Sequence, residues 1–273
     1  MITRESFVDE IVSLIEESEV SLPDDVERAL EAAFERESDP IARSQLGAIL
    51  ENIEIAREKR IPLCQDTGIL IFDVVVGTHA RISFDIRDAI VDAVAVATET
   101  VPLRPSVVHP LTRKNTGNNT GKGLPDVLFN LVRGSSLEVS LYPKGAGSEN
   151  MSRLVMLKPI ESDEIRKFVL ETIISAGGMP CPPVIVGVGI GGSSDLAARL
   201  AKRAALRPLG PMSEFERELC DAVNALGIGP MGLGGDTTAL GVHVEMAHSH
   251  TASLPVAVNI QCWASRRAHK KFF

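Results

Sequence analysis

This 273-residue sequence has few aromatic residues, no long uninterrupted apolar run and no excess of basic residues. Aromatic residues make up 4% of it, and 28 Lys and Arg stand against 36 Asp and Glu, for a formal charge of -8. An acidic balance argues against a general nucleic-acid binder and against binding to anionic membrane surfaces. The composition, 44% hydrophobic and 23% charged, is otherwise typical of a globular protein and excludes a disordered chain.

The sequence also lacks a convincing membrane-spanning or signal segment. The longest stretch without charge covers residues 172–194, but its prolines and glycines cannot form one continuous helix in lipid. The N-terminus, MITRESFVDE, has no basic region followed by an apolar one, as a signal peptide would. We therefore expect a cytoplasmic protein without membrane association.

The only strongly basic segment is 266–271, RRAHKK, near the C-terminus. Two interpretations of it stay open. It either contacts a partner protein or forms a frayed, solvated tail.

Periodicity predicts a mixed α/β fold. Helical spacing of apolar residues covers about residues 4–60, an all-helical N-terminal portion. A mixed β-sheet flanked by helices is expected after it, with β-rich runs at 69–76, 126–132, 137–142, 183–190, 240–245 and 256–261. Helical patterns intervene at 87–100, 163–174, 194–206 and 213–226. No linker separates two halves, so we expect a single domain, 1–273, with a helical portion (1–60) and an α/β portion (61–273).

Two glycine-rich motifs suggest nucleotide binding, and neither has the context it needs. GVGIGG at 187–192 matches the dinucleotide fingerprint, but LRPLGP at 206–211 stands where a strand ending in an acid is required, which disfavours a nicotinamide-dependent dehydrogenase. GNNTGKG at 117–123 is one residue short of a phosphate loop and lacks its magnesium-binding hydroxyl. The second segment is either a surface turn or a loop that closes over substrate.

The four cysteines are the strongest chemical signal. Cys64, Cys181, Cys220 and Cys262 lie 117, 39 and 42 residues apart, without a C-x-x-C, which argues against a disulfide scaffold. Three of them lie at expected strand ends or turns, whereas Cys220 lies in an amphipathic helix. Three thiolates can hold zinc or an iron–sulfur cluster, and spacing alone does not choose between them.

Six segments after residue 60 resemble, in the same order, the class I fumarases. They are CQDTG at Cys64, LRPSVVHPLTRKNTGNNTG at Leu103, PKGAGSEN at Pro143, GGMPCPP at Gly177, GIGPMGLGGDTTALGV at Gly227 and HTASLPVAVNIQCWASRR at His250. The resemblance is to the α subunit of the two-subunit form, which is also similar to the α subunit of L(+)-tartrate dehydratase.

The resemblance implies a hydro-lyase with a [4Fe-4S] cluster in which one iron lacks a cysteine ligand. By motif, Cys64, Cys181 and Cys262 are the expected ligands. By the same resemblance, the open iron would supply a Lewis acid for the hydroxyl of a 2-hydroxy diacid.

The resemblance assigns the other family residues to contacts with the substrate. Gln65, Arg104 and Gly145 are expected to bind it, with Arg104 as a bidentate carboxylate clamp. Asp66 and His250 are expected to form the acid pair that protonates departing hydroxide. Simpler roles remain open: Asp66 as a turn cap, His250 bonded to a backbone carbonyl, and Arg104 as a surface charge.

The resemblance also implies a partner. A separate β subunit is expected to supply the catalytic base and the rest of the active site, in an αβ or α2β2 assembly. We expect a four-carbon dicarboxylate substrate, namely fumarate and malate of the tricarboxylic acid cycle, with L(+)-tartrate as the alternative. A zinc-stabilised binding or scaffold subunit is the hypothesis from a different class.

Overall fold

The computed structural model describes residues 2–160 and 163–273, which form two compact units. The chain passes from one unit to the other after residues 23, 52, 146 and 265. Unit 1 comprises Met1–Pro23, Ile53–Ala146 and Arg266–Phe273, and unit 2 comprises Asp24–Asn52 and Gly147–Ser265. The single domain expected from the sequence stays a prediction.

The N-terminal portion is helical, as predicted. It contains α1 (Arg4–Val20), α2 (Asp24–Arg36) and α3 (Pro40–Lys59). The start of α1 is capped by Thr3, whose hydroxyl oxygen accepts a hydrogen bond from the amide of Ser6. These helices do not form a unit of their own, because α1 belongs to unit 1, α2 to unit 2, and α3 has residues in both.

Unit 1 is built on a four-stranded sheet with the order β2-β1-β3-β8. Its further elements are β1 (Ile69–Gly77), α4 (Ile86–Thr100), β2 (Asp126–Val132), β3 (Leu137–Lys144) and β8 (Ala268–Lys271). Strand β1 runs parallel to β2 and antiparallel to β3, and β8 pairs antiparallel with β3 at the sheet edge.

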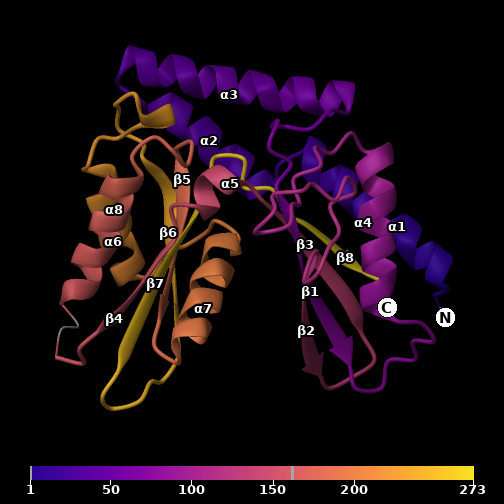
Figure 1. The fold of residues 1–273 in the computed structure, drawn as a ribbon. Coiled ribbons are helices and arrows are strands. Elements are labelled where there is room, and N and C mark those ends of the chain that lie inside the picture. The colour runs from indigo at the N-terminus through magenta and orange to yellow at the C-terminus, as the bar shows by residue number, and fades with distance from the viewer. Residues whose placement is uncertain (1, 161–162) are drawn as a thin grey trace. The chain divides into compact units, whose positions relative to one another are not determined.

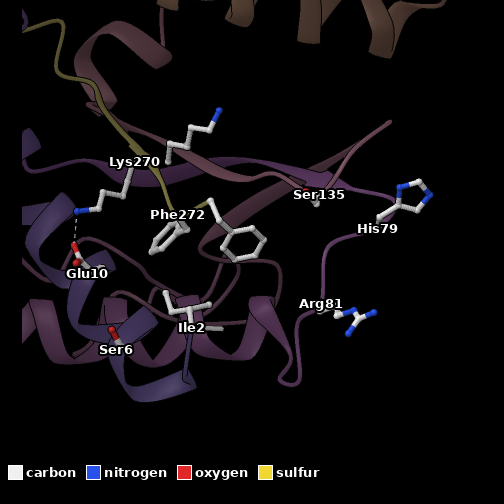
Figure 2. A pocket seen from close by; sticks show the side chains of 10 residues that line it. Ile2, Ser6, Glu10, His79, Arg81, Ser135, Lys270 and Phe272 are labelled. Carbon is white, nitrogen blue, oxygen red and sulfur yellow. Dashed lines mark ion pairs between the residues drawn. The ribbon is translucent and has the colours of Figure 1, made fainter.

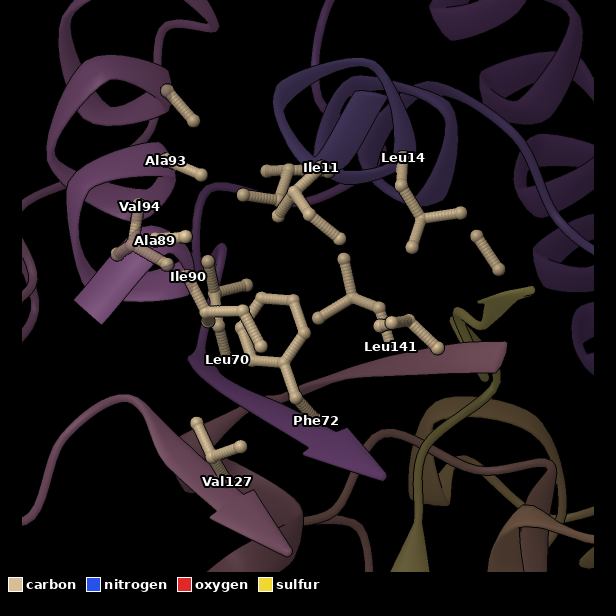
Figure 3. Packing of buried hydrophobic residues seen from close by; sticks show 14 of the residues in the cluster. Ile11, Leu14, Leu70, Phe72, Ala89, Ile90, Ala93, Val94, Val127 and Leu141 are labelled. Atoms are coloured by element: carbon tan, nitrogen blue, oxygen red, sulfur yellow. The ribbon is translucent and has the colours of Figure 1, made fainter. Parts of the chain in front are cut away.

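The core of unit 1 lies between this sheet and the helices α1 and α4. Phe72 of β1 is fully buried among side chains from both helices, including Ile11 and Ile90 (Figure 3). Strand β3 alternates, with Leu137, Val139 and Leu141 facing this core. The period of two in β3 and the helical spacing in α1 are the patterns from which the sequence predicts these elements.

Unit 2 has three layers around a sheet with the order β4-β7-β5-β6. Its strands are β4 (Arg153–Leu157), β5 (Val184–Ile190), β6 (Ala239–Met246) and β7 (Leu254–Gln261). Its helices, besides α2 and most of α3, are α5 (Ala146–Glu149, whose first residue belongs to unit 1), α6 (Glu164–Ala176), α7 (Ser194–Leu206), α8 (Glu214–Asn224) and the short 3-10 helix η1 (Pro230–Gly232). Helices α6 and α8 share a hydrophobic core with β5, β6 and β7, and α7 packs on the sheet as well.

The glycines of the GVGIGG motif bring α7 close to β5. A Cβ atom added to Gly187 would lie 2.0 Å from the carbonyl oxygen of Ala201, and one added to Gly189 would lie 2.0 Å from that of Ala197. Because real Cβ contacts are never this short, only glycine permits this helix–strand approach. This packing explains both glycines without a dinucleotide.

Most of the predicted strands and helices are confirmed. Four short elements were missed: α5, β4, β8 and the 3-10 helix η1. Strand β4 is the short apolar run RLVML and β8 is the polar sequence AHKK, so neither shows the apolar–polar alternation from which half-buried strands are predicted. The tail interpretation of the basic end is wrong, because Ala268–Lys271 is a paired strand.

Across residues 2–160 and 163–273, no helix combines the length and apolar character that crossing a bilayer requires.

Candidate active site

Two of the motifs meet in unit 1 where strand β1 begins and strand β3 ends. Strands β1 and β3 are antiparallel, with Ile69 opposite Lys144, so the turn before β1 and the residues after β3 lie at the same end of the two strands. That turn is CQDTG, and Gly145 follows β3 directly. Gly68 has a φ of +80°, and a Cβ there would lie 2.7 Å from the backbone of Lys144, so the approach requires glycine.

The Asp66 carboxylate joins these two segments. Its Oδ1 accepts a hydrogen bond from the amide of Gly68 at 3.0 Å, and its Oδ2 accepts one from the amide of Ala146 at 2.7 Å. Two backbone donors fix the orientation of the carboxylate, which has lone pairs left for a further partner. Asp66 thus caps a turn, as the simpler interpretation holds, and a proton-transfer role stays a prediction.

A third motif, the segment that begins at Leu103, contacts the CQDTG turn through Thr67. The amide of Arg104 donates to the Thr67 hydroxyl oxygen at 3.1 Å. Cys64, Gln65 and Arg104 line one cavity of about 520 Å³, whose other walls come from Ile61, Pro62, Thr67, Pro102 and Leu103. Three residues predicted as site residues, from segments about 40 residues apart, therefore line the same cavity.

The Arg104 side chain is available for an anion. It is exposed, and no hydrogen bond or ion pair engages its guanidinium within the residues that the structure describes. Its backbone is held instead. The buried side chain of Asn119 donates to the carbonyl oxygen of Arg104 at 3.2 Å and accepts from the amide of Ser106 at 2.7 Å. The loop is thus anchored, while the cation at its start stays free to form a fork with a carboxylate.

Sequence reasoning missed Thr67 and considered Asn119 only as a candidate donor to substrate, not as a support of this cavity. Both lie inside recognised motifs, and the signal that would have identified them is burial, at 3% and 5% exposure, which sequence does not report. A buried polar side chain needs partners, and here the partners are the backbone groups of the Arg104 loop.

In unit 2, strand pairing brings two cysteines to the same end of the neighbouring strands β5 and β7. Cys181 precedes β5 and Cys262 follows β7, and these strands are antiparallel with Ile185 opposite Gln261. The amide of Trp263 donates to the carbonyl oxygen of Cys181 at 3.2 Å. The loop before β6 lies at the same end of the strands, because the amide of Met231 donates to the carbonyl oxygen of Pro182 at 2.8 Å.

Three of the four cysteines differ from the fourth in burial and position. Cys64, Cys181 and Cys262 are partly buried in segments outside the helices and strands, and Cys181 has a φ of 55° between two prolines. Left-handed backbone at a non-glycine residue persists only where the surroundings fix it, which suits a thiol held in a set direction. Cys220 differs, because it is part of the hydrophobic core and burial raises the pKa of its thiol to about 11.

The two units contribute differently to this set. Cys64 belongs to unit 1, whereas Cys181 and Cys262 belong to unit 2. Among the described residues, no three His, Cys, Asp or Glu side chains form a group that could hold a metal ion. The chemistry of the three thiols fits an iron–sulfur cluster or zinc, and their common ligation stays a prediction.

His250 does not lie beside the cysteines of its own unit. It is in the turn between β6 and β7, and the length of β7 separates it from Cys262 at the other end of that strand (Figure 1). The imidazole is exposed, and its Nδ1 accepts a hydrogen bond from the amide of Ala252 at 3.1 Å. Its pairing with Asp66 stays a prediction.

A second cavity, of about 680 Å³, lies at the C-terminal end of unit 1 (Figure 2). Phe272, Lys270, Arg81 and His79 are among the residues that line it, and Lys270 is paired with Glu10 at 2.7 Å. It is the larger of the two, but none of the predicted site residues lines it. The smaller cavity is therefore the better candidate for catalysis.

Comparison with known proteins agrees with the motifs. The family model described as fumarate hydratase (Fumerase) matches residues 8–271. A Methanocaldococcus jannaschii protein, provisionally named as an L(+)-tartrate dehydratase subunit alpha, is 50% identical over 274 residues, or 96% of each chain. The proteins named L(+)-tartrate dehydratase subunit alpha from Escherichia coli K12 and Shigella sonnei are each 37% identical over 254 residues, covering 90% of this chain and 84% of theirs.

These findings define a hydro-lyase, an enzyme that adds water to a carbon–carbon double bond or, in the reverse direction, eliminates water to form one. The chain belongs to the fumarate hydratase family.

Proposed function

We propose that the chain is the α subunit of a [4Fe-4S] hydro-lyase that interconverts fumarate and L-malate together with a separate β subunit. The observation that carries the proposal is the cavity of unit 1, which combines the Cys64 thiol, the Gln65 amide and the unpaired Arg104 guanidinium. A metal ligand beside a carboxylate-binding cation is the combination that dehydration of a hydroxy diacid requires.

Three thiolates would hold the cluster: Cys64 from unit 1, and Cys181 and Cys262 from unit 2. The cluster would supply a Lewis-acidic iron that stabilises departing hydroxide. Cys220 is not part of this set, because its thiol is in the core and resists ionisation.

The polar side chains of unit 1, and His250 of unit 2, have separate roles in the proposal. Arg104 binds one carboxylate of the substrate through two parallel hydrogen bonds, and Gln65 and the Gly145 loop orient it. A side chain at position 145 would disturb the site, since a Cβ there would lie 3.2 Å from Oδ2 of Asp66. Asp66 holds the proton for departing hydroxide and His250 completes the acid pair. The catalytic base is assigned to the β subunit.

L(+)-tartrate is the second candidate substrate. The observation that favours it is the name of the relatives, which are described as L(+)-tartrate dehydratase alpha subunits at 37–50% identity. Both candidates are four-carbon diacids that Arg104 would bind in the same way.

The test is co-expression of the chain with its β subunit in the absence of oxygen, followed by assays on L-malate, fumarate and L(+)-tartrate under argon. The proposal predicts an oxygen-sensitive brown αβ or α2β2 protein that interconverts fumarate and malate. Turnover of tartrate alone would assign the second candidate. A colourless, air-stable protein with bound zinc and no turnover would support a zinc-stabilised scaffold and contradict the proposal. Fractionation of the cells that produce the protein would test the expected cytoplasmic location.

A further inference from the structure

A buried ion pair in unit 1 plays no part in the roles assigned above. Glu19 of α1 and Arg266, two residues before β8, form it with side-chain exposures of 0% and 1%. Nη1 of Arg266 donates to Oε2 of Glu19. Arg266 is the largest fully buried side chain among the described residues. The sequence assigns this arginine to a basic end that either contacts a partner or frays, so its burial within unit 1 is a finding of the structure.

Stability alone does not explain the pair. Removing two charges from water is costly, and a hydrophobic pair of similar volume often stabilises a fold as well or better. The second carboxylate oxygen, Oε1 of Glu19, has no hydrogen-bond partner in the part of the chain that the structure describes. Burial raises the pKa of Glu19 to about 7, against the opposing effect of the Arg266 charge.

The contacts of the pair lead to the candidate active site. The amide of Leu63 donates to the backbone carbonyl of Glu19 at 2.8 Å, and Nη2 of Arg266 donates to the backbone carbonyl of Asp66 at 2.9 Å. These two bonds hold both ends of a four-residue segment, and the residues between them are Cys64 and Gln65. Both line the cavity of about 520 Å³.

The planar guanidinium makes this arrangement directional. One arm of the Arg266 fork is held by the Glu19 carboxylate, and the other arm reaches the Asp66 carbonyl. The fork geometry is rigid, so fixing one arm fixes the direction of the other. Lysine would supply the charge but not this two-sided geometry.

We propose that Glu19 and Arg266 are positioning residues whose buried ion pair holds the Leu63–Asp66 segment, so that the Cys64 thiol and the Gln65 amide keep their places in the cavity. The inference rests on the proposed function for its catalytic meaning. The placement of Cys64 is measurable without any catalysis.

The first experiment uses the full-length chain without cluster. Iodoacetamide labels the chain, and peptide mass spectrometry gives the alkylation rate of Cys64, while hydrogen exchange reports the Leu63 amide. Glu19→Gln and Arg266→Lys are each expected to speed alkylation of Cys64 by about threefold or more, because the segment opens locally. The matched control is Glu216→Gln in unit 2, which breaks another buried carboxylate–arginine contact, to Arg207 at 2.6 Å, and leaves Cys64 unchanged.

A double variant guards against misfolding. Glu19→Leu with Arg266→Met fills the same space without unpaired buried charge, so the fold is expected to survive. If this variant melts near the wild-type temperature and Cys64 reacts faster, the pair positions the segment. If Cys64 and the Leu63 amide behave as in the wild type, the pair is only structural and the inference is overturned.

The second experiment uses the αβ holoenzyme. Misplacement of the segment is expected to lower kcat about tenfold or more in Arg266→Lys, whereas Glu216→Gln keeps the wild-type kcat. An unchanged kcat in Arg266→Lys would contradict the inference. Absence of hydro-lyase activity in the wild type would instead refute the proposed function, and the alkylation rates would still decide the role of the pair.

Discussion

Replacing Gly68 with alanine measures how closely the CQDTG turn lies against strand β3. At a φ of +80°, an alanine loses about 1–2 kcal/mol of conformational free energy. A stiffer unfolded chain returns about 0.4–1 kcal/mol of this. The new Cβ would also lie 2.7 Å from the carbonyl carbon and oxygen of Lys144, and overpacking of this kind typically costs about 1–3 kcal/mol. We expect Gly68→Ala to lower the free energy of unfolding by about 2–4 kcal/mol.

Gly123→Ala is the matched control within the same unit. Gly123 has a φ of +82°, but nothing lies within 4 Å of its added Cβ, so only the conformational cost of about 1 kcal/mol applies. Urea unfolding followed by circular dichroism gives both values. If Gly68→Ala costs no more than Gly123→Ala, the close approach of the turn to β3, and with it the geometry of the cavity, is wrong.

Two further predictions concern charged side chains. Glu216 is buried, but the amides of Ser213 and Val244 and the guanidinium of Arg207 outweigh burial and lower its pKa from 4.5 to about 2. Its stabilisation, about 3 kcal/mol at most, is thus present above pH 4.5 and lost as pH falls towards 2. Urea unfolding across this range should show a steeper loss for the wild type than for Glu216→Gln, and parallel curves would refute the assignment. Arg104→Lys should raise the KM for the dicarboxylate about tenfold with an unchanged melting temperature, and an unchanged KM would remove Arg104 from the site.

Much of the fold was predictable because it follows from local periodicity. The alternation in β3 and the helical spacing in α1 identify these elements without tertiary information. The division into two units was not predictable. The chain leaves unit 1 after residue 23 and returns at residue 53, and no change in composition marks either point.

The site was predictable as a set of residues and not as an arrangement. Motifs name Cys64 and Arg104, but the two segments that line their cavity are joined by the hydrogen bond from the Arg104 amide to the Thr67 hydroxyl oxygen, a contact that no motif reports. Glu19 carried no signal at all. An acid in an amphipathic helix is ordinarily solvated, and only the buried Arg266 opposite it reveals a different role.

The most direct test of the account is the iron and sulfide content of four single variants of the αβ protein, prepared without oxygen. Cys64→Ser, Cys181→Ser and Cys262→Ser should each lose most of the iron and the brown colour, because each removes one of three cluster ligands. Cys220→Ser should keep both, since its thiol belongs to the core. Full iron content in any of the first three variants, or its loss in the fourth alone, would contradict a cluster held by Cys64, Cys181 and Cys262.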